Sequence, residues 1–275
     1  MLTAIRTADG QKVHAKLAFK LHAPFHCATC GNQVFLAKGR VRVHHFRHFA
    51  EDRSCPRSVG ESEQHYHCKN AIFEALQAAE GVSRVDLEHR VGRNIADVFA
   101  VIRGVKVAIE IQRSQLSVEA ITARTAWYHS EGVFVLWLAF LTEEACLSEY
   151  SPSAWERWCH AAYGGRVYYW VEGQTIQPIH FGPHTVKVPV TSWVGRDRIE
   201  RTAGGYEKAS KRYRNPMHGH RVEIASAFVP RKRPEWAAGT VHVPRCSLYL
   251  DRQPVWWTPV CASPRLNVEQ QRDPS

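Results

Sequence analysis

Two apolar segments each carry one carboxylate: Ile95-Ala96-Asp97-Val98-Phe99-Ala100-Val101 and Val107-Ala108-Ile109-Glu110-Ile111-Gln112. Their content of Val, Ile and Ala predicts two strands, joined by a turn at Arg103-Gly104. The centre of this turn lies about equally far from Asp97 and Glu110, so antiparallel pairing would place the two acids almost opposite each other. Like charges at that distance disfavour folding unless a cation lies between them or the pair faces water at a sheet edge.

The flanking residues extend this pair into a layer of helices and strands. A third strand is predicted over Arg84–Val91, directly before the pair. Residues 61–80 place apolar side chains on one helical face, which predicts a helix. Ser117 is the expected N-cap of a second helix, and the apolar run at residues 133–138 is typical of a buried strand. The order helix, three-strand meander, helix, strand predicts a mixed α/β (α+β) fold, with the second helix as a crossover between strands.

A third polar group follows the second acid. Gln112 lies two residues past Glu110 and therefore points to the same face of the strand. Two carboxylates and such a group form an arrangement typical of metal-dependent phosphodiesterases, in which the acids bind Mg²⁺ and the third group orients the attacking water. On the predicted helix Glu61, His65 and Lys69 recur every four residues, and this stripe either faces the same site or is a solvated surface.

Cysteine and histidine residues near the N-terminus have the spacing of a zinc site. Cys27 and Cys30 form a CxxC step, and His45 and His48 follow after a predicted hairpin that can bring the two pairs together. Two thiolates and two imidazoles would close a tetrahedral structural Zn²⁺ site. Cys55 or His44 could replace one of these ligands. The alternatives are a redox CxxC, a catalytic zinc with an open position, or no metal.

The net charge of +10 is distributed unevenly along the chain. Residues 1–60 and residues 195–275 each carry +7, whereas residues 61–194 carry −4. This pattern suits a central block that holds a divalent cation between flanks that hold a polyanion. The sequence therefore predicts three parts: an N-terminal zinc-binding module, a central α/β domain, and a basic C-terminal extension whose Pro-interrupted texture suggests that it is only partly ordered.

No segment of the sequence predicts membrane insertion. The longest apolar run, Val133–Leu141, is about half the length that a membrane-spanning helix needs. The first residues become polar quickly, so a signal peptide is not expected. Together with eight cysteines that suit thiols or metal ligands, this predicts a cytoplasmic protein.

These motifs together resemble the competence-protein CoiA-like family, whose core is a PD-(D/E)XK nuclease fold. The resemblance covers roughly residues 20–185 and rests on the order and spacing of several short motifs rather than on one of them. The motifs are Cys27 to Cys30, His45 to His48, Glu61 to Lys69, Arg93 to Val98, Glu110 to Ser114, and Arg124 to Tyr128.

The resemblance implies a restriction-endonuclease-like αβββαβ core and a DNA-directed nuclease linked to uptake, transformation, recombination or repair. Asp97 and Glu110 would hold Mg²⁺ or Mn²⁺, and Glu61 would be the acid of the first motif. Ala96 stands where the superfamily has the name-giving Pro, and Gln112 stands where it has Lys. The expected substrate is DNA, with single-stranded or branched forms included, and recombination or uptake proteins are expected partners.

Five further residues are candidates for contacts with DNA in such a site: His65, Lys69, Arg93, Arg124 and Tyr128. Two other functions remain open on the sequence. One is a zinc-stabilised, catalytically weak DNA-binding accessory protein of recombination, and the other is a protein-interaction role. Paired carboxylates near phosphate favour the nuclease, because a protein that only binds DNA has no use for them.

Overall fold

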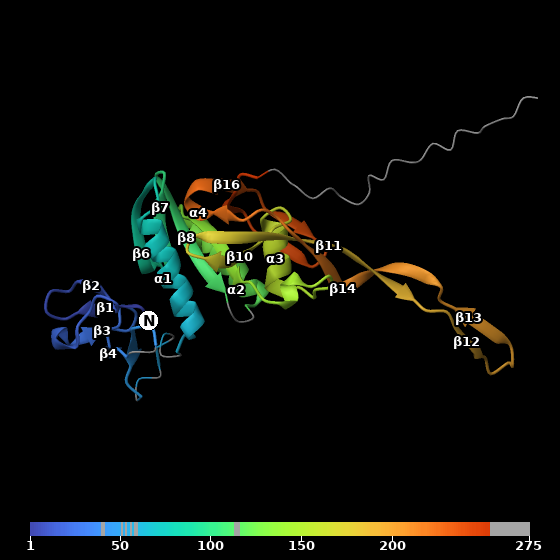
Figure 1. Ribbon diagram of the computed structural model, residues 1–275, viewed down its shortest axis with the longest axis horizontal. Coiled ribbons are helices and arrows are strands. Elements are labelled where there is room, and N and C mark those ends of the chain that lie inside the picture. The colour runs from blue at the N-terminus through green and yellow to red at the C-terminus, as the bar shows by residue number, and fades with distance from the viewer. Residues whose placement is uncertain are drawn as a thin grey trace, which may run out of the picture.

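The computed structural model describes residues 1–39, 42–50, 52, 54–55, 57, 60–112 and 116–253 (Figure 1). Val41 of the expected N-terminal hairpin, Arg113 and Ser114 of the expected motif, and the expected loose end after Cys261 lie outside the described residues. The described residues form two separate apolar cores, one in the N-terminal module and one in the rest of the chain.

The N-terminal module is a five-stranded sheet in the order β2-β1-β3-β4-β5. The predicted hairpin is present, but its second strand begins at His45 and therefore includes the expected histidine ligands. Phe25, Val34 and Phe46 form the centre of the module's own core. The strands are β1 Thr3–Arg6, β2 Lys12–His14, β3 Phe25–His26, β4 Gln33–Ala37 and β5 His45–His48, with a short 3-10 helix at Lys20–His22.

The central segment has the predicted order of helix, meander, helix and strand. Strands β6, β7 and β8 pair antiparallel, and β9 runs parallel to β8 after the crossover helix. Ser62 and Ser117 cap the two helices, because their side chains accept hydrogen bonds from the backbone N–H groups of His65 and Ala120. The elements are α1 Glu63–Gln77, β6 Val82–Val91, β7 Asn94–Ile102, β8 Val105–Gln112, α2 Val118–Ser130 and β9 Phe134–Phe140.

The main sheet lies beneath these helices and extends past β9. Helix α1 packs against β6, β7, β8 and β10 (Val167–Glu172), with Ile72 and Leu76 fully buried. Helix α2 packs against β9 and against α3 (Ala154–Ala162), and a 3-10 turn at Glu144–Cys146 precedes α3. Nearly every residue of β9 is buried, as expected for a parallel strand in the centre of a covered sheet.

The C-terminal part differs from the predicted extension. Its residues after Gly219 enter the main core, where Phe228, Leu248 and Tyr249 are buried, and β19 pairs in parallel with β9. The sequence did not predict this contribution, because the strands are interrupted by Pro and Arg and each is too short to show a clear alternation of apolar and polar residues. The elements are β15 Val222–Glu223, α4 Ile224–Ala227, β16 Phe228–Arg233, β17 Trp236–Ala238, β18 Val241–Val243 and β19 Cys246–Asp251.

A long antiparallel hairpin, between the central segment and the C-terminal part in the sequence, extends from the body of the molecule. It consists of β11 (Thr175–Val188) and β14 (Tyr206–His218), and a second hairpin of β12 (Thr191–Val194) and β13 (Glu200–Ala203) forms its far end (Figure 1). The boundary expected near Val194 therefore falls inside this hairpin. Within the described part of the chain, no helix is both long and apolar enough to cross a membrane.

Candidate active site and metal centre

Glu88 and Asp97 lie opposite each other on adjacent strands. The pairs on both sides of them, Leu87↔Val98 and His89↔Ala96, share one register, which places Glu88 of β6 opposite Asp97 of β7. Glu88 adopts a positive φ of 49°, a left-handed conformation that costs a non-glycine residue free energy. A strained residue with a buried carboxylate beside another acid marks this position as a candidate site.

Glu110 extends this pair into a row. The last paired residues of β7 and β8 at this end are Val98 and Ile109, and the next residues along the two strands are Asp97 and Glu110. Continued by one residue, this register would place Glu110 opposite Asp97; that their carboxylates share one site stays a prediction. Glu88, Asp97 and Glu110 together form what is called the acid row below, one carboxylate from each of three neighbouring strands.

Lys69 of α1 supplies positive charge to this row. Its side chain is 1% exposed, and Nζ lies 3.2 Å from Glu88 Oε1 and 3.4 Å from Asp97 Oδ1, with a further ion pair to Glu61. Burial alone would lower the pKa of Lys69, but the three carboxylates raise it well above its ordinary value. Lys69 is therefore a permanent cation inside the fold.

His65 lies one turn before Lys69 on the same face of α1. Its Nδ1 is 3.0 Å from Glu61 Oε2, and its Nε2 is 3.3 Å from Asp97 Oδ2. Burial opposes the charged form, yet the two carboxylates raise the pKa of His65 to about 9. Conversely, burial would raise the pKa of Asp97, but Lys69, His65 and a hydrogen bond from the Ile111 N–H hold it well below its ordinary range.

Glu110 is held from the other helix. Arg124 Nη2 donates to Glu110 Oε1 at 2.6 Å, and the hydroxyl of the buried Tyr128 donates to the same oxygen. Burial raises the pKa of Glu110 to about 7, and the nearby charge of Asp97 adds to this rise, while Arg124 opposes it. Among the described residues, no hydrogen bond is found to the second oxygen, Oε2.

The remaining predicted residues occupy two different places. Gln112 lines a cavity of about 360 Å³ at the end of β8, together with Gln64, Thr142 and Trp155. Arg93 does not reach the acids through a direct contact, because its guanidinium stacks over the ring of Trp127 at 4.2 Å. The structure thus brings Glu61, His65, Lys69 and Asp97 into one network and holds Glu110, Arg124 and Tyr128 in an adjoining one.

Glu88 is the residue that the sequence analysis did not single out. Its carboxylate accepts hydrogen bonds from Leu2 N at 2.8 Å, Thr3 N at 3.0 Å and Thr3 Oγ1 at 2.8 Å, and it pairs with Arg57 at 2.6 Å. It therefore joins the N-terminal module to Lys69. The sequence contains a signal that could have identified Glu88, because it is an acid inside a predicted strand, as Asp97 and Glu110 are.

The N-terminal module carries a second cluster that can hold a metal. The ligand atoms of Cys27, Cys30, His48 and Cys55 all lie within 4.8 Å of one another, with Cys30 Sγ 3.4 Å from His48 Nε2. Three thiols and one imidazole at this spacing are compatible with a closed tetrahedral structural zinc site. The backbone N–H groups of Thr29 and Arg57 donate to the sulfur atoms of Cys27 and Cys55, as expected for ligands that carry negative charge.

His45 lies outside this cluster, so the expected ligand set changes at one position. Its Nδ1 is 2.8 Å from the carbonyl of Val43, and its ring stacks on Tyr66 of α1 at 5.2 Å. Cys55, the alternative ligand in the sequence analysis, takes its place. The loop after β5 returns to the CxxC step, whereas His45 at the start of β5 points toward α1.

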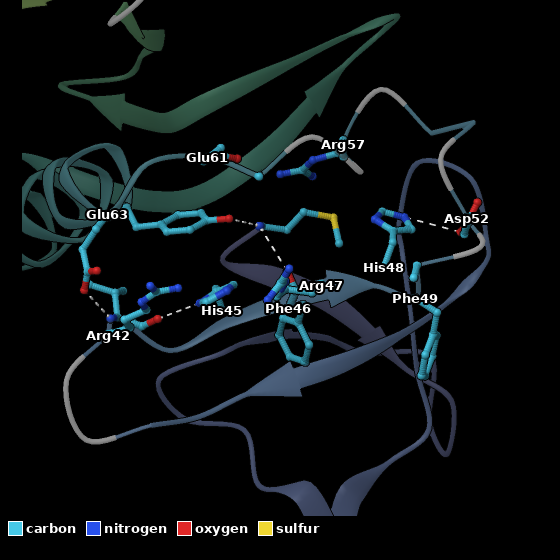
Figure 2. Close-up of a pocket in the computed structure, with 15 residues that line it drawn as sticks. Arg42, His45, Phe46, Arg47, His48, Phe49, Asp52, Arg57, Glu61 and Glu63 are labelled. Carbon is cyan, nitrogen blue, oxygen red and sulfur yellow. Dashed lines mark hydrogen bonds and ion pairs between the residues drawn. The ribbon is translucent and has the colours of Figure 1, made fainter.

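A cavity of about 720 Å³ lies between the zinc-type cluster and the start of α1 (Figure 2). Arg42, Arg47 and Arg57 line it together with Glu61 and Glu63. Since Glu61 also contacts Lys69 and His65, the cavity leads from the surface of the N-terminal module toward the acid row.

Comparison with known proteins places the acid row in a recognised domain. Residues 61–156 match the family model described as competence protein CoiA, nuclease-like domain. Neither a curated protein nor a solved structure matches the chain. The matched residues include Glu61, Asp97, Glu110 and Tyr128, so the family assignment and the acid row concern the same part of the molecule.

Proposed function

We propose, since residues 61–156 match the CoiA nuclease-like domain model, that this protein hydrolyses phosphodiester bonds of DNA with a divalent cation, on a restriction-endonuclease-like PD-(D/E)XK core. The proposed biological setting is DNA uptake, transformation, recombination or repair. The nuclease-like domain itself, residues 61–194 in this proposal, lies between the zinc-binding module of residues 1–60 and the basic C-terminal part.

The observation that carries this proposal is the acid row with its lysine. The three carboxylates come from neighbouring positions of β6, β7 and β8, and the buried Lys69 contacts two of them, Glu88 and Asp97. Carboxylates that serve only solubility lie in water, so their burial here requires a specific compensating partner. A fixed cation can attract a phosphate group, and acids beside it can take part in the attack on that group.

The donor set fits a divalent cation such as Mg²⁺ or Mn²⁺. Oxygen ligands are the ones that these ions prefer, and the second carboxylate oxygen of Glu110 is not engaged by a described donor. Among the residues that the structure describes, Asp97 Oδ1 has one polar contact, with Lys69 Nζ at 3.4 Å. Bound by Asp97 and Glu110, the ion would make hydroxide available near neutral pH and neutralise the scissile phosphate.

The other side chains then have separate tasks. In this proposal Glu61 and Gln112 hold water, and Lys69, which pairs with Glu61, provides the positive charge that Gln112 lacks at the superfamily's lysine position. His65, a cation at neutral pH, orients Asp97 and can contact phosphate. Arg124 and Tyr128 hold Glu110, while Arg93 lies near the protein surface on Trp127 and is a candidate for strand contact.

A cytoplasmic location is part of this proposal. Thiols and thiolate metal ligands are the usual forms of cysteine in a reducing compartment, where disulfides are rare. The alternative function is a catalytically weak, zinc-stabilised DNA-binding accessory protein of recombination. It is favoured by one observation, namely that Lys69 and His65 already neutralise Asp97 without a metal.

A cleavage assay on single-stranded, duplex and branched DNA, with and without Mg²⁺, distinguishes the two functions. Asp97→Asn and Glu110→Gln are nearly isosteric and should lower cleavage by a factor on the order of 100 or more, with DNA binding equal or tighter. Asp86→Asn on β6 is the matched control, because Asp86 is partly exposed and pairs only with residues of its own strand. Folded variants that cut DNA at the wild-type rate would contradict this site assignment, and absence of Mg²⁺-dependent cleavage by the wild-type protein would favour the accessory function.

A further inference from the structure

The hairpin that leaves the body of the molecule, residues 183–214, is called the β-arm below (Figure 1). None of its residues is buried, although β11 is buried over much of its length before Gly182. About twelve residues separate its base from its tip, which corresponds to a reach of roughly 40 Å at ~3.3 Å per residue. A two-stranded ribbon without a covered face contributes little to folding, so its length requires another explanation.

The β-arm carries an excess of positive charge. Eight Lys or Arg residues stand against three acids, a net charge of +5. Two of the acids are paired, Glu207 with Lys187 at 3.8 Å and Asp197 with Arg201 at 2.5 Å. Six cations form no ion pair with any residue that the structure describes. Four of these, Arg196, Arg198, Lys208 and Lys211, also have side chains without a hydrogen bond or ring contact to a described residue, unlike Arg212 and Arg214.

The base of the β-arm has a defined basic bulge. The register of β11 and β14 shifts between Pro183 and Thr185, which leaves residues 210–213 outside the ladder. Ser210 accepts a hydrogen bond from Tyr213 N at 2.9 Å, and the Arg212 guanidinium lies 5.1 Å from the ring of Tyr213. The bulge therefore presents Lys211 and Arg212 on a fixed backbone.

The tip of the β-arm is apolar as well as basic. Val190, Trp193, Val194 and Ile199 are between 47% and 67% exposed. Trp193 is paired across the ribbon with Arg201, so an aromatic and a basic residue occupy opposite positions of the two strands. Exposed apolar groups among cations are the combination with which ribbon-shaped proteins enter a DNA groove and contact bases.

We propose that the β-arm binds duplex DNA along one groove and so delivers a double-stranded region to the nuclease-like domain; this rests on the proposed function only for the identity of the polymer. A two-stranded ribbon fits the width of a DNA groove, and the reach of the β-arm matches about one helical turn. A single strand would need a groove with stacking platforms, whereas the β-arm is a convex rod.

The first test removes the unpaired charges. A variant with Arg196, Arg198, Lys208 and Lys211 changed to Ala should bind duplex DNA at least about tenfold more weakly, and its salt slope should fall by about two to four. The matched control changes four exposed, unpaired cations of the body, Lys20, Lys106, Arg231 and Lys232, to Ala. An equal loss in both variants would show that general charge, not the β-arm, binds the DNA.

The second test removes the tip. Residues 189–205 can be replaced by Asn-Gly, because Val188 and Tyr206 are directly paired and a two-residue turn closes such a pair. This deletion spares Phe228 and Leu248, which a truncation after Val194 would remove from the core. The expected result is a loss of duplex affinity with unchanged affinity for single strands.

Binding is measured without added Mg²⁺ and without a chelator, which would remove the structural zinc, so its outcome does not depend on cleavage. Wild-type affinity for duplex DNA in the tip deletion would overturn the proposal for the β-arm and leave the nuclease proposal standing. Absence of Mg²⁺-dependent cleavage by the wild-type protein would overturn the nuclease proposal alone. If the deletion instead converts a dimer into a monomer at unchanged DNA affinity, the occupant of the β-arm is a second copy of the chain, which also overturns the proposal.

Discussion

Lys69 Nζ lies 3.2 Å from Glu88 and 3.4 Å from Asp97, so one buried ammonium group bridges two strands of the acid row. Through Glu88 the same ammonium group is linked to the backbone of Leu2 and Thr3 in the N-terminal module. The module, helix α1 and the acid row thus share one charge network, and its stability depends on the balance of cations and anions in it.

Removal of the lysine charge should destabilise the whole network. Lys69→Met keeps the length of the side chain but leaves Glu61, Glu88 and Asp97 without their central cation, which should lower the free energy of unfolding by about 3–5 kcal/mol. Urea denaturation measures this loss. Lys16→Met is the control, because Lys16 forms an exposed ion pair with Glu74 and should change stability by less than about 1 kcal/mol. Equal effects of the two substitutions would contradict a central role of Lys69.

The N-terminal module should contain about one zinc per chain, since four ligands close one tetrahedral site. Cys55→Ser should lose the metal and lower the thermal stability of the module, because a closed site contributes folding free energy. His45→Ala should retain the metal, since His45 stacks on Tyr66 away from the cluster. Elemental analysis of reduced, freshly purified protein decides; metal loss in His45→Ala but not in Cys55→Ser would reverse the assignment.

The turn between β6 and β7 should tolerate no side chain at Gly92. This glycine has φ +55°, and a Cβ there would lie 2.7 Å from the ring of Trp127, whose Nε1 donates to Val91 O at 3.1 Å. Gly92→Ala should therefore cost about 2 kcal/mol more than Gly104→Ala, which has φ +79° but open space around it. Denaturant unfolding of the two variants isolates the contact with Trp127, and equal losses would show that the ring moves aside freely.

A buried histidine should make the fold sensitive to mild acid. Burial, with His180 and Arg214 nearby, lowers the pKa of His160 to about 4, and its Nε2 accepts a hydrogen bond from Phe181 N at 3.2 Å. Because this pKa lies below the ordinary value of 6.5, His160 contributes stability above pH 6.5 that is lost as the pH falls from 6.5 toward 4.

The expected size of this loss is up to about 3 kcal/mol. His160→Gln keeps a hydrogen-bond acceptor but does not titrate, so its unfolding free energy should fall less than that of the wild-type protein between pH 7.5 and pH 5. Chemical denaturation at both pH values measures the difference. Parallel losses in the two proteins would mean that His160 is protonated in the folded state without cost.

The sequence predicted the meander because its strands carry strong local signals. Apolar residues with one acid each, the short turn at Gly104 and the serine cap at Ser117 are all predicted from neighbouring residues, whereas the cap at Ser62 was not predicted. The juxtaposition of Asp97 and Glu110 followed from the same counting, because a short turn fixes the register of a hairpin.

Other features depended on contacts between distant residues. Cys55 replaces His45 beside Cys30 because of the path of the loop after β5, and ligand spacing alone does not determine that path. The role of Glu88 depends on donors from Leu2 and Thr3, more than eighty residues away in the sequence. The sequence predicted the C-terminal strands as an extension. They enter the core because β19 pairs with β9, and no local sequence pattern indicates such a pairing.

The pairing of Leu248 with Val135 also bears on how the chain acquires its structure. The centre of the main sheet is completed by a segment synthesised more than a hundred residues after β9, so a nascent chain that has released residues 61–156 still lacks β10 and β19, both of which pair with that strand. Closing so long a loop is slow, because its entropic cost precedes the contacts that compensate it. Until β19 arrives, the beginning of β9 presents an open apolar edge, and this interval is the stage of synthesis at which the protein is most exposed to aggregation and to chaperones.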